Sequence, residues 1–345
     1  MPRRICIILL ILLGLGSSML IAQGRQQFAS LGDFRLENGQ VIRDCKIGYR
    51  TFGQLNASRS NAILWPTWFT GTTKNLMGFV GTGKLLDPAK YYVILVDALG
   101  DGISSSPSNS AIQPHMHFPQ FTIRDMVNAE HQLATQTLHL SHLHAVMGIS
   151  MGGMQTFQWI VSYPNFMDKA IPIVGSPRLT SYDLLLWTAE LHALEEDPAW
   201  NHGDYQMPPQ AGMDTVADIH SLALTTPTYR VAHTSRAEFP HFLQETEAST
   251  LRSFDANNWI RQLQAMLADD VSAPYGGSME KAAAQVHAKV LVIPSQQDHM
   301  VNPIPALNFA HLIHARVFEL TSNCGHLATG CELSQMTPVI QAFLQ

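Results

Sequence analysis

Short runs of apolar, largely β-branched residues recur along this chain of 345 residues, and helical patterns separate most of them. Near-continuous apolar runs of this length are typical of strands that are buried on both faces, as in parallel sheets. The runs cover residues 61–66, 91–97, 143–148, 170–175, 289–294 and 316–320. Two earlier alternating segments, 34–36 and 41–52, predict an antiparallel hairpin at the edge. The sequence therefore predicts the α/β class, with helices covering both faces of a mostly parallel sheet.

A long interval without a strand pattern interrupts this series. Between residues 180 and 278 the sequence is helical and loop-like. Such an insertion inside an α/β core is most simply a helical lid over the carboxyl edge of the sheet, where open α/β sheets bind their ligands. We therefore expect a core in two parts, 23–179 and 279–345, with the lid at 180–278.

The composition excludes some classes of protein. Hydrophobic residues make up 46% of the chain and charged residues only 14%, which argues against disorder. The net charge of −6 is spread along the sequence without a basic block, so we expect no nucleic-acid partner.

Residues 1–22 differ from the rest of the chain. Two arginines precede an apolar run that starts at Cys6, and small residues follow the run. This order predicts a secretory signal that is cleaved near Ala22, and hence export to the periplasm or the exterior. An uncleaved membrane anchor is the alternative, because the run is of borderline length for crossing a bilayer.

A serine motif joins one predicted strand to a predicted helix. The strand that ends at Met147 leads into Gly-Ile-Ser-Met-Gly at 148–152, and residues 154–163 have a helical pattern. G-x-S-x-G between a strand and a helix indicates a nucleophile elbow, in which glycines at −2 and +2 leave room for a strained serine. The following helix favours negative charge near Ser150 through its N-terminus. A glycine-rich turn with an uninvolved serine is the alternative.

A serine nucleophile needs a general base and an acid that orients the base. In this architecture the acid and then the histidine follow the serine in the chain. Asp298 comes directly after the predicted strand 289–294, and His326 follows the strand 316–320. We therefore predict Ser150, Asp298 and His326 as a catalytic triad. His299 is a weaker choice of base, because adjacent residues on an extended loop point apart.

Stabilising a tetrahedral oxyanion requires two backbone N–H donors. One donor is expected from Met151, directly after the nucleophile. The other is expected from the loop after strand 61–66, where Phe69 is the first choice and Thr70 the second. Thr70 is also a candidate substrate-binding residue.

His326 lies between Cys324 and Cys331, and several other histidines occur in pairs. The seven-residue spacing of the two cysteines permits a disulfide, but three small buried residues, including Cys45, would fit equally well. The histidine pairs 115/117 and 142/144 have no acids or cysteines at ligand spacing beside them. We therefore expect no metal and no cofactor.

Several further motifs resemble the homoserine O-acetyltransferase-like branch of the α/β-hydrolases over nearly the whole mature chain. The matching segments are 46–56, 81–91, 99–108, 121–125, 151–159, 162–164 and 254–257. The resemblance implies the α/β-hydrolase fold with a lid, and the same catalytic roles for Ser150, Asp298 and His326. It also implies a homodimer formed through the lid, which nothing in the residues themselves indicates.

The sequence departs from this family at the substrate-binding positions. In the acetyltransferases an aspartate after the catalytic histidine holds the amino group of homoserine, and Leu327 occupies that position here. The family's substrate-binding arginine on the first lid helix has no counterpart, because residues 181–197 contain no Lys or Arg. Unpaired charges are costly in a closed site, so these departures disfavour an amino-acid substrate. Arg230 matches another lid motif and is either a contact for an anionic substrate or a surface residue.

Taken together, these patterns predict an exported serine esterase that acts on a modest acyl ester through an acyl-Ser150 intermediate. An O-acyltransferase that uses an alcohol as acceptor is the alternative within the same chemistry. A catalytically inactive binding protein with this fold is the alternative from another class.

Overall fold

The computed structural model describes residues 24–345, so the predicted signal segment 1–22 lies outside the described residues. Eight strands form one sheet in the order β1-β2-β4-β3-β5-β6-β7-β8. The strands are β1 (Gln27–Arg35), β2 (Val41–Phe52), β3 (Ala62–Pro66), β4 (Tyr92–Val96), β5 (Leu143–Ile149), β6 (Met167–Ile173), β7 (Lys289–Val292) and β8 (Arg316–Val317). Strands β1 and β2 are antiparallel to their neighbours, and all pairs from β4 to β8 are parallel. The predicted α/β class, the edge hairpin and the parallel core are confirmed.

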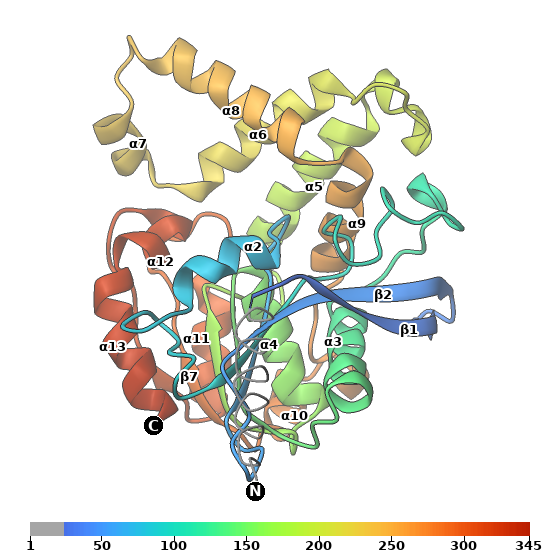
Figure 1. The fold of residues 1–345 in the computed structure, drawn as a ribbon. Coiled ribbons are helices and arrows are strands. Elements are labelled where there is room, and N and C mark those ends of the chain that lie inside the picture. The colour runs from blue at the N-terminus through green and yellow to red at the C-terminus, as the bar shows by residue number, and fades with distance from the viewer. Residues whose placement is uncertain (1–23) are drawn as a thin grey trace, which may run out of the picture.

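Helices cover both faces of the sheet and rise above one of its edges (Figure 1). They are α2 (Thr73–Leu76), α3 (Ile123–Gln132), α4 (Met151–Ser162), α5 (Ser181–Glu195), α6 (Gln210–Leu224), α7 (Pro227–His233), α8 (Phe239–Ser253), α9 (Ala256–Leu267), α10 (Met279–Ala283), α11 (Pro303–Leu312), α12 (Ala328–Cys331) and α13 (Leu333–Leu344). None of the helices within residues 24–345 is long and apolar enough to span a bilayer.

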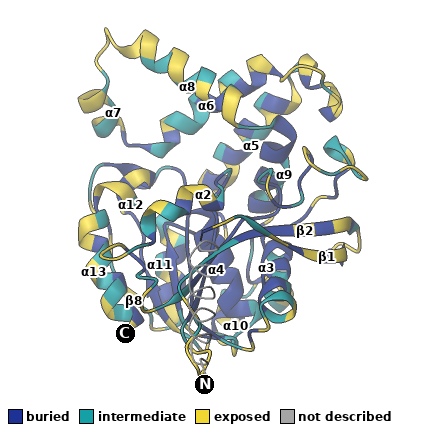
Figure 2. Ribbon diagram, viewed as in Figure 1, coloured by how far each residue is buried: buried dark blue, intermediate teal, exposed yellow. Residues whose placement is uncertain are grey.

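The central strands are buried on both faces because their side chains alternate between two cores. In β3, Ala62 and Leu64 belong to the core that holds α3, α4 and α11, whereas Ile63 and Trp65 belong to the core that holds α13. Both sets of side chains are fully buried. Figure 2 shows the central strands and α4 in the colour of buried residues. Because both faces of the central strands are buried, the sequence of each of these strands is a continuous apolar run.

Some strands differ in length from the predicted runs. β1 begins at Gln27, before the predicted segment 34–36. The sequence pattern did not reveal its first half, because a register shift at Gly32 interrupts the alternation of buried and exposed residues. β6 begins at Met167, where polar residues hid the start of the strand from an apolar-run criterion. β8 spans only Arg316–Val317, and Leu320 continues the ladder as an isolated bridge to Ser295. Each difference lies at a sheet edge or a strand end, where burial is incomplete.

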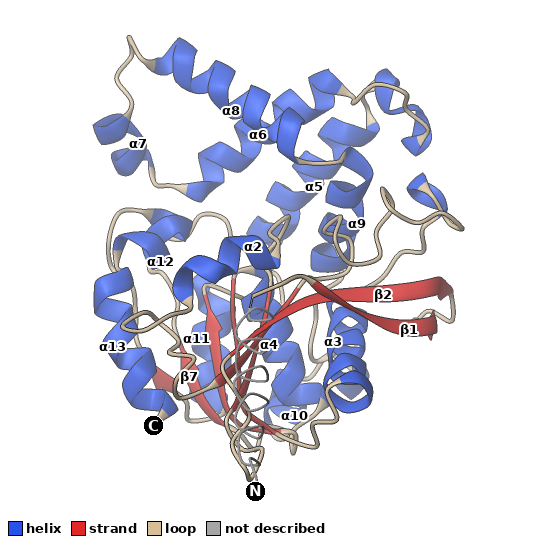
Figure 3. Cartoon of the chain, viewed as in Figure 1, coloured by secondary structure: helices blue, strands red, loops and turns tan. Residues whose placement is uncertain are grey.

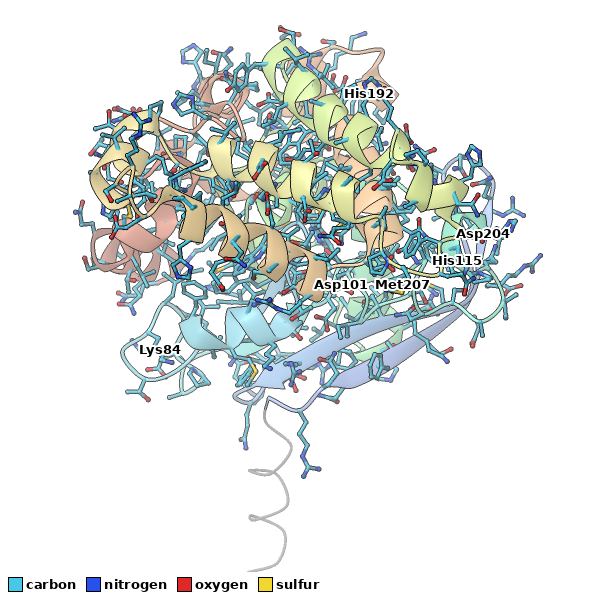
Figure 4. The ribbon with its side chains drawn as sticks, turned by 90° about the horizontal axis from the view of Figure 1, so that it is seen from above. Lys84, Asp101, His115, His192, Asp204 and Met207 are labelled. Atoms are coloured by element: carbon cyan, nitrogen blue, oxygen red, sulfur yellow. A yellow bond between two sulfur atoms is a disulfide. The ribbon has the colours of Figure 1, made fainter. Side chains whose placement is uncertain are left out.

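The interval between β6 and β7 holds helices α5 to α10 and no strand of the sheet (Figure 3). In the view of Figure 1, helices α5 to α8 lie above the ends of the parallel strands. Seen from above, these helices extend across the upper face of the molecule, with His192 on the exposed side of α5 (Figure 4).

Candidate active site

Ser150 occupies a sharp turn between β5 and α4. Its backbone has φ 58° and ψ −122°, which is a strained conformation for a residue with a side chain. A Cβ atom on Gly148 would lie 2.2 Å from the carbonyl oxygen of Gly152, and one on Gly152 would lie 2.7 Å from the carbonyl oxygen of Pro66. Larger residues would therefore push the turn away from β3. The helix begins at Met151 rather than at the predicted residue 154, because this close approach lets it start directly after the serine.

The side chains of Ser150, His326 and Asp298 form one hydrogen-bonded chain. His326 Nε2 lies 2.8 Å from Ser150 Oγ, and His326 Nδ1 lies 2.7 Å from Asp298 Oδ2. All three residues are at least nine-tenths buried. With the Nδ1–H donating to Asp298, Nε2 is left to accept the serine proton. The structure thus brings together three residues that are up to 176 positions apart in the sequence.

Asp298 is oriented by the backbone that follows it. Its Oδ1 accepts hydrogen bonds from the N–H groups of Met300 at 2.8 Å and Val301 at 2.9 Å. These bonds direct Oδ2 towards His326. His299 is not part of the hydrogen-bonded chain that leads to Ser150.

Several contacts hold the loop that carries His326. Cys324 and Cys331 form a disulfide, and Cys45 is a free buried cysteine among the described residues. Ser295 Oγ donates to the carbonyl oxygen of Gly325 at 2.8 Å. From the lid, Thr226 Oγ1 donates to the carbonyl oxygen of Asn323 at 2.6 Å. Sequence reasoning missed the contributions of Ser295 and Thr226, because no local pattern distinguishes these hydroxyls from surface ones.

Within residues 24–345, the backbone N–H groups of Phe69 and Met151 have no protein acceptor. The N–H of Thr70, by contrast, donates to Gln262 Oε1 of α9 at 2.8 Å. This bond removes the second-choice donor and keeps Phe69 as the first choice. Gln262 itself was not predicted, because its role depends on how α9 packs against the loop.

A cavity of about 330 Å³ opens beside this loop, between Thr70 and helix α9. Asp101, labelled in Figure 4, lies on its wall. Burial is the main cause that raises the pKa of Asp101 well above its ordinary value, and the nearby Asp97 carboxyl raises it further. Asp97 accepts the N–H of Thr73 at 2.6 Å and so anchors the start of α2. Asp97 therefore fixes the end of the loop, whereas Asp101 accepts the N–H groups of Ile103 and Ser104.

Two of the predicted substrate-binding residues, Leu327 and Arg230, lie in different surroundings. Leu327 follows His326 directly, and its side chain is 43% exposed. The recorded contacts of Arg230 are with lid residues: its guanidinium lies 4.1 Å from the centre of the Phe242 ring and donates to Thr234. None of these contacts joins Arg230 to Ser150.

The paired histidines have separate local partners. His142 Nε2 lies 2.9 Å from Asp168, and His144 Nε2 lies 2.7 Å from the carbonyl oxygen of Leu344. Within residues 24–345 no three His, Cys, Asp or Glu side chains gather as a metal site would require.

Comparisons with known proteins agree with this fold. Residues 69–329 match the family described as the alpha/beta hydrolase fold. The chain is 32% identical to an ethyl acetate hydrolase of Pseudomonas veronii over 332 residues, covering 93% of this chain and 95% of the relative. It is 30% identical to a homoserine O-acetyltransferase of Geotalea uraniireducens over 356 residues, covering 91% and 94%. The crystal structure of the acetyl esterase MekB superposes with a TM-score of 0.87 at 31% identity, covering 93% and 96%.

The chain belongs to the α/β-hydrolase family. Within that family it is a member of the homoserine O-acetyltransferase-like branch, which also contains esterases. The protein is therefore an acyl-transfer enzyme with an α/β-hydrolase fold.

Proposed function

We propose that the protein is a serine esterase that hydrolyses small acyl esters through an acyl-Ser150 intermediate. The observation that carries this proposal is the continuous chain from Ser150 Oγ to His326 Nε2 and from Nδ1 to Asp298. Such a chain is the arrangement that activates a hydroxyl, because the base is in hydrogen-bond range and its tautomer is set by the acid.

The reaction follows from these positions. Ser150 Oγ attacks the ester carbonyl carbon while its proton passes to His326 Nε2. The oxyanion accepts hydrogen bonds from the N–H groups of Phe69 and Met151. The bond to the alcohol oxygen then breaks, and His326 returns the proton to the leaving alcohol. Water, deprotonated by His326, attacks the acyl-enzyme, releases the carboxylic acid and restores Ser150.

Water is the proposed acceptor because the site lacks the charges that an amino-acid acceptor needs. Leu327 presents an exposed apolar side chain beside His326, and α5 contains no Lys or Arg. A zwitterion would find neither a carboxylate for its ammonium group nor a cation for its carboxylate at these two positions. The similarity to an ethyl acetate hydrolase supports a short acyl group.

A series of p-nitrophenyl esters from acetate to decanoate tests this proposal, with and without homoserine as a competing acceptor. We expect the highest kcat/KM for short acyl chains and free carboxylic acid as the product in both conditions. Mass spectrometry of the products measures the partition between acids and O-acyl-homoserine. A product mixture dominated by O-acyl-homoserine would show that the enzyme is an acyltransferase and that the hydrolase proposal is wrong.

Export is a second part of the proposal and rests on the pattern of residues 1–22. We expect the protein isolated from cell envelope or culture medium to begin close to residue 23. Intact-mass measurement of the purified protein decides this, since an uncleaved anchor keeps the full mass and fractionates with membranes. Recovery of full-length protein from the cytoplasm would contradict export.

A further inference from the structure

Aromatic rings of the lid (residues 180–278) lie around the side chain of Phe69. The ring of Trp259 in α9 meets it edge-on, with centroids 4.8 Å apart. The rings of Trp187 in α5 and His220 in α6 lie 5.8 Å and 5.9 Å from it. Three lid helices therefore each contribute one ring to the surroundings of Phe69. The backbone N–H of this same residue is the proposed oxyanion donor.

A buried carboxylate joins two of these rings. Glu190, on α5 one turn after Trp187, is fully buried. It accepts hydrogen bonds from the indole N–H of Trp259 at 3.2 Å and from His220 Nδ1 at 3.1 Å. A buried carboxylate that loses its hydrogen-bond partners costs free energy. The two hydrogen bonds therefore fix the rings of Trp259 and His220 relative to Glu190.

Helix α6 continues from this cluster to the loop that holds the base. His220 lies about one turn before the end of α6 at Leu224. Directly afterwards, Thr225 and Thr226 pack on Gly325, where a Cβ atom would lie 3.1 Å from the Thr225 Cα. One helical turn spans about 5 Å, so a single turn of α6 joins the surroundings of Phe69 to the loop of His326.

We propose that Glu190 and His220 are positioning residues. They hold the backbone N–H of Phe69 in a fixed position relative to the loop that carries His326. This inference rests on the proposed function, because it takes Phe69 as an oxyanion donor. Neither residue takes part in the hydrogen-bonded chain from Ser150 to Asp298. Their effect passes through the Phe69 ring and the end of α6, so the lid sets the geometry of the site as well as covering it. A displacement of one donor by a fraction of an ångström weakens transition-state binding more than substrate binding.

Variants of this cluster test the inference. Glu190→Leu and His220→Phe remove the hydrogen bonds, and His220→Phe keeps an aromatic ring of similar size. We expect both to lower kcat about 10- to 100-fold with KM within about 2-fold. Glu190→Gln is expected to stay close to wild type. Its oxygen still accepts from Trp259, and its N–H can donate to the other tautomer of His220.

A transition-state analogue separates positioning from a merely structural role. Ser150 Oγ adds to the carbonyl carbon of an alkyl trifluoromethyl ketone. The resulting oxyanion needs hydrogen bonds from the same two donors, the N–H groups of Phe69 and Met151. We expect its inhibition constant to rise by the same factor by which kcat falls. An unchanged inhibition constant, a loss confined to KM, or a Glu190→Gln variant as impaired as Glu190→Leu would each overturn the inference.

Glu130 supplies the matched control for removing a buried acid. It accepts the indole N–H of Trp159 at 2.6 Å in the core below the lid, and burial raises its pKa to about 8. Glu130→Leu is expected to change the melting temperature but to leave kcat within about 2-fold. A fall in kcat equal to that of Glu190→Leu would assign both effects to general destabilisation and would reject the positioning role. If the wild-type protein forms no covalent adduct at Ser150 with a fluorophosphonate, the proposed function itself is rejected.

Discussion

Ser150→Ala is expected to lower kcat for ester hydrolysis by about 10⁵- to 10⁶-fold while the protein stays folded. The hydroxyl is the proposed nucleophile, and within residues 24–345 no other side chain hydrogen-bonds to His326 Nε2, which lies 2.8 Å from Ser150 Oγ. Alanine tolerates the strained backbone of this turn as well as serine does, so the melting temperature should change little. The residual rate would come from the oxyanion donors and from substrate binding.

Covalent labelling makes this prediction specific. A fluorophosphonate should form a single adduct on Ser150 in the wild-type protein and none in Ser150→Ala, as measured by intact mass and peptide mapping. Ser162→Ala, in the last turn of the same helix, is the matched control and should keep both the adduct and the activity. If folded wild-type protein forms no adduct at Ser150, the chain is an inactive binding protein with this fold and the esterase proposal fails.

Asp298→Asn is expected to lower kcat about 10⁴-fold, which corresponds to roughly 5 kcal/mol of transition-state stabilisation. The carbonyl oxygen of the new amide would stay with the N–H groups of Met300 and Val301, which now bind Oδ1. The amide N–H₂ would then face His326 Nδ1, where it can only donate. His326 would accept at Nδ1 and carry its proton on Nε2, so it could no longer take the proton from Ser150.

Steady-state kinetics and a matched pair check this second prediction. KM should change little, because Asp298 does not contact the substrate. Asp168 lies 2.9 Å from His142 at the surface, so Asp168→Asn removes an Asp–His contact elsewhere in the molecule and should leave kcat unaffected. A loss of less than about 10-fold in Asp298→Asn would mean that another group orients His326 and that the assignment of the acid is wrong.

Local sequence patterns predicted the parts of the site that are controlled by the backbone. The G-x-S-x-G motif located the strained turn, because only glycine allows the approach of α4 to Pro66. Asp298 and His326 could be predicted because each follows a strand of the parallel part of the sheet, and parallel strands bring their carboxyl ends to one edge. Phe69 and Met151 followed from the same placement. The lid could be predicted only as an interval without strands.

The contacts between the lid and the core could not be predicted from the sequence. Gln262, which binds the N–H of Thr70, lies 192 residues further along the chain. Glu190 and His220 resemble ordinary helix residues until α5, α6 and α9 pack together. No alternating or helical pattern encodes such pairs, because periodicity reports which face of an element is buried and not which residue it meets.

The amino-acid sequence by itself determined the class of fold, the elbow and the order of serine, acid and histidine, since these depend on strand burial and on the backbone freedom of glycine. Only the tertiary structure decided that His326 lies within hydrogen-bond range of both Ser150 and Asp298, and that the Thr70 amide is occupied. It alone placed the rings of Trp187, His220 and Trp259 around Phe69. The physical reason is that hydrogen bonds and ring contacts act over a few ångströms, so residues distant in sequence acquire them only after the chain has packed.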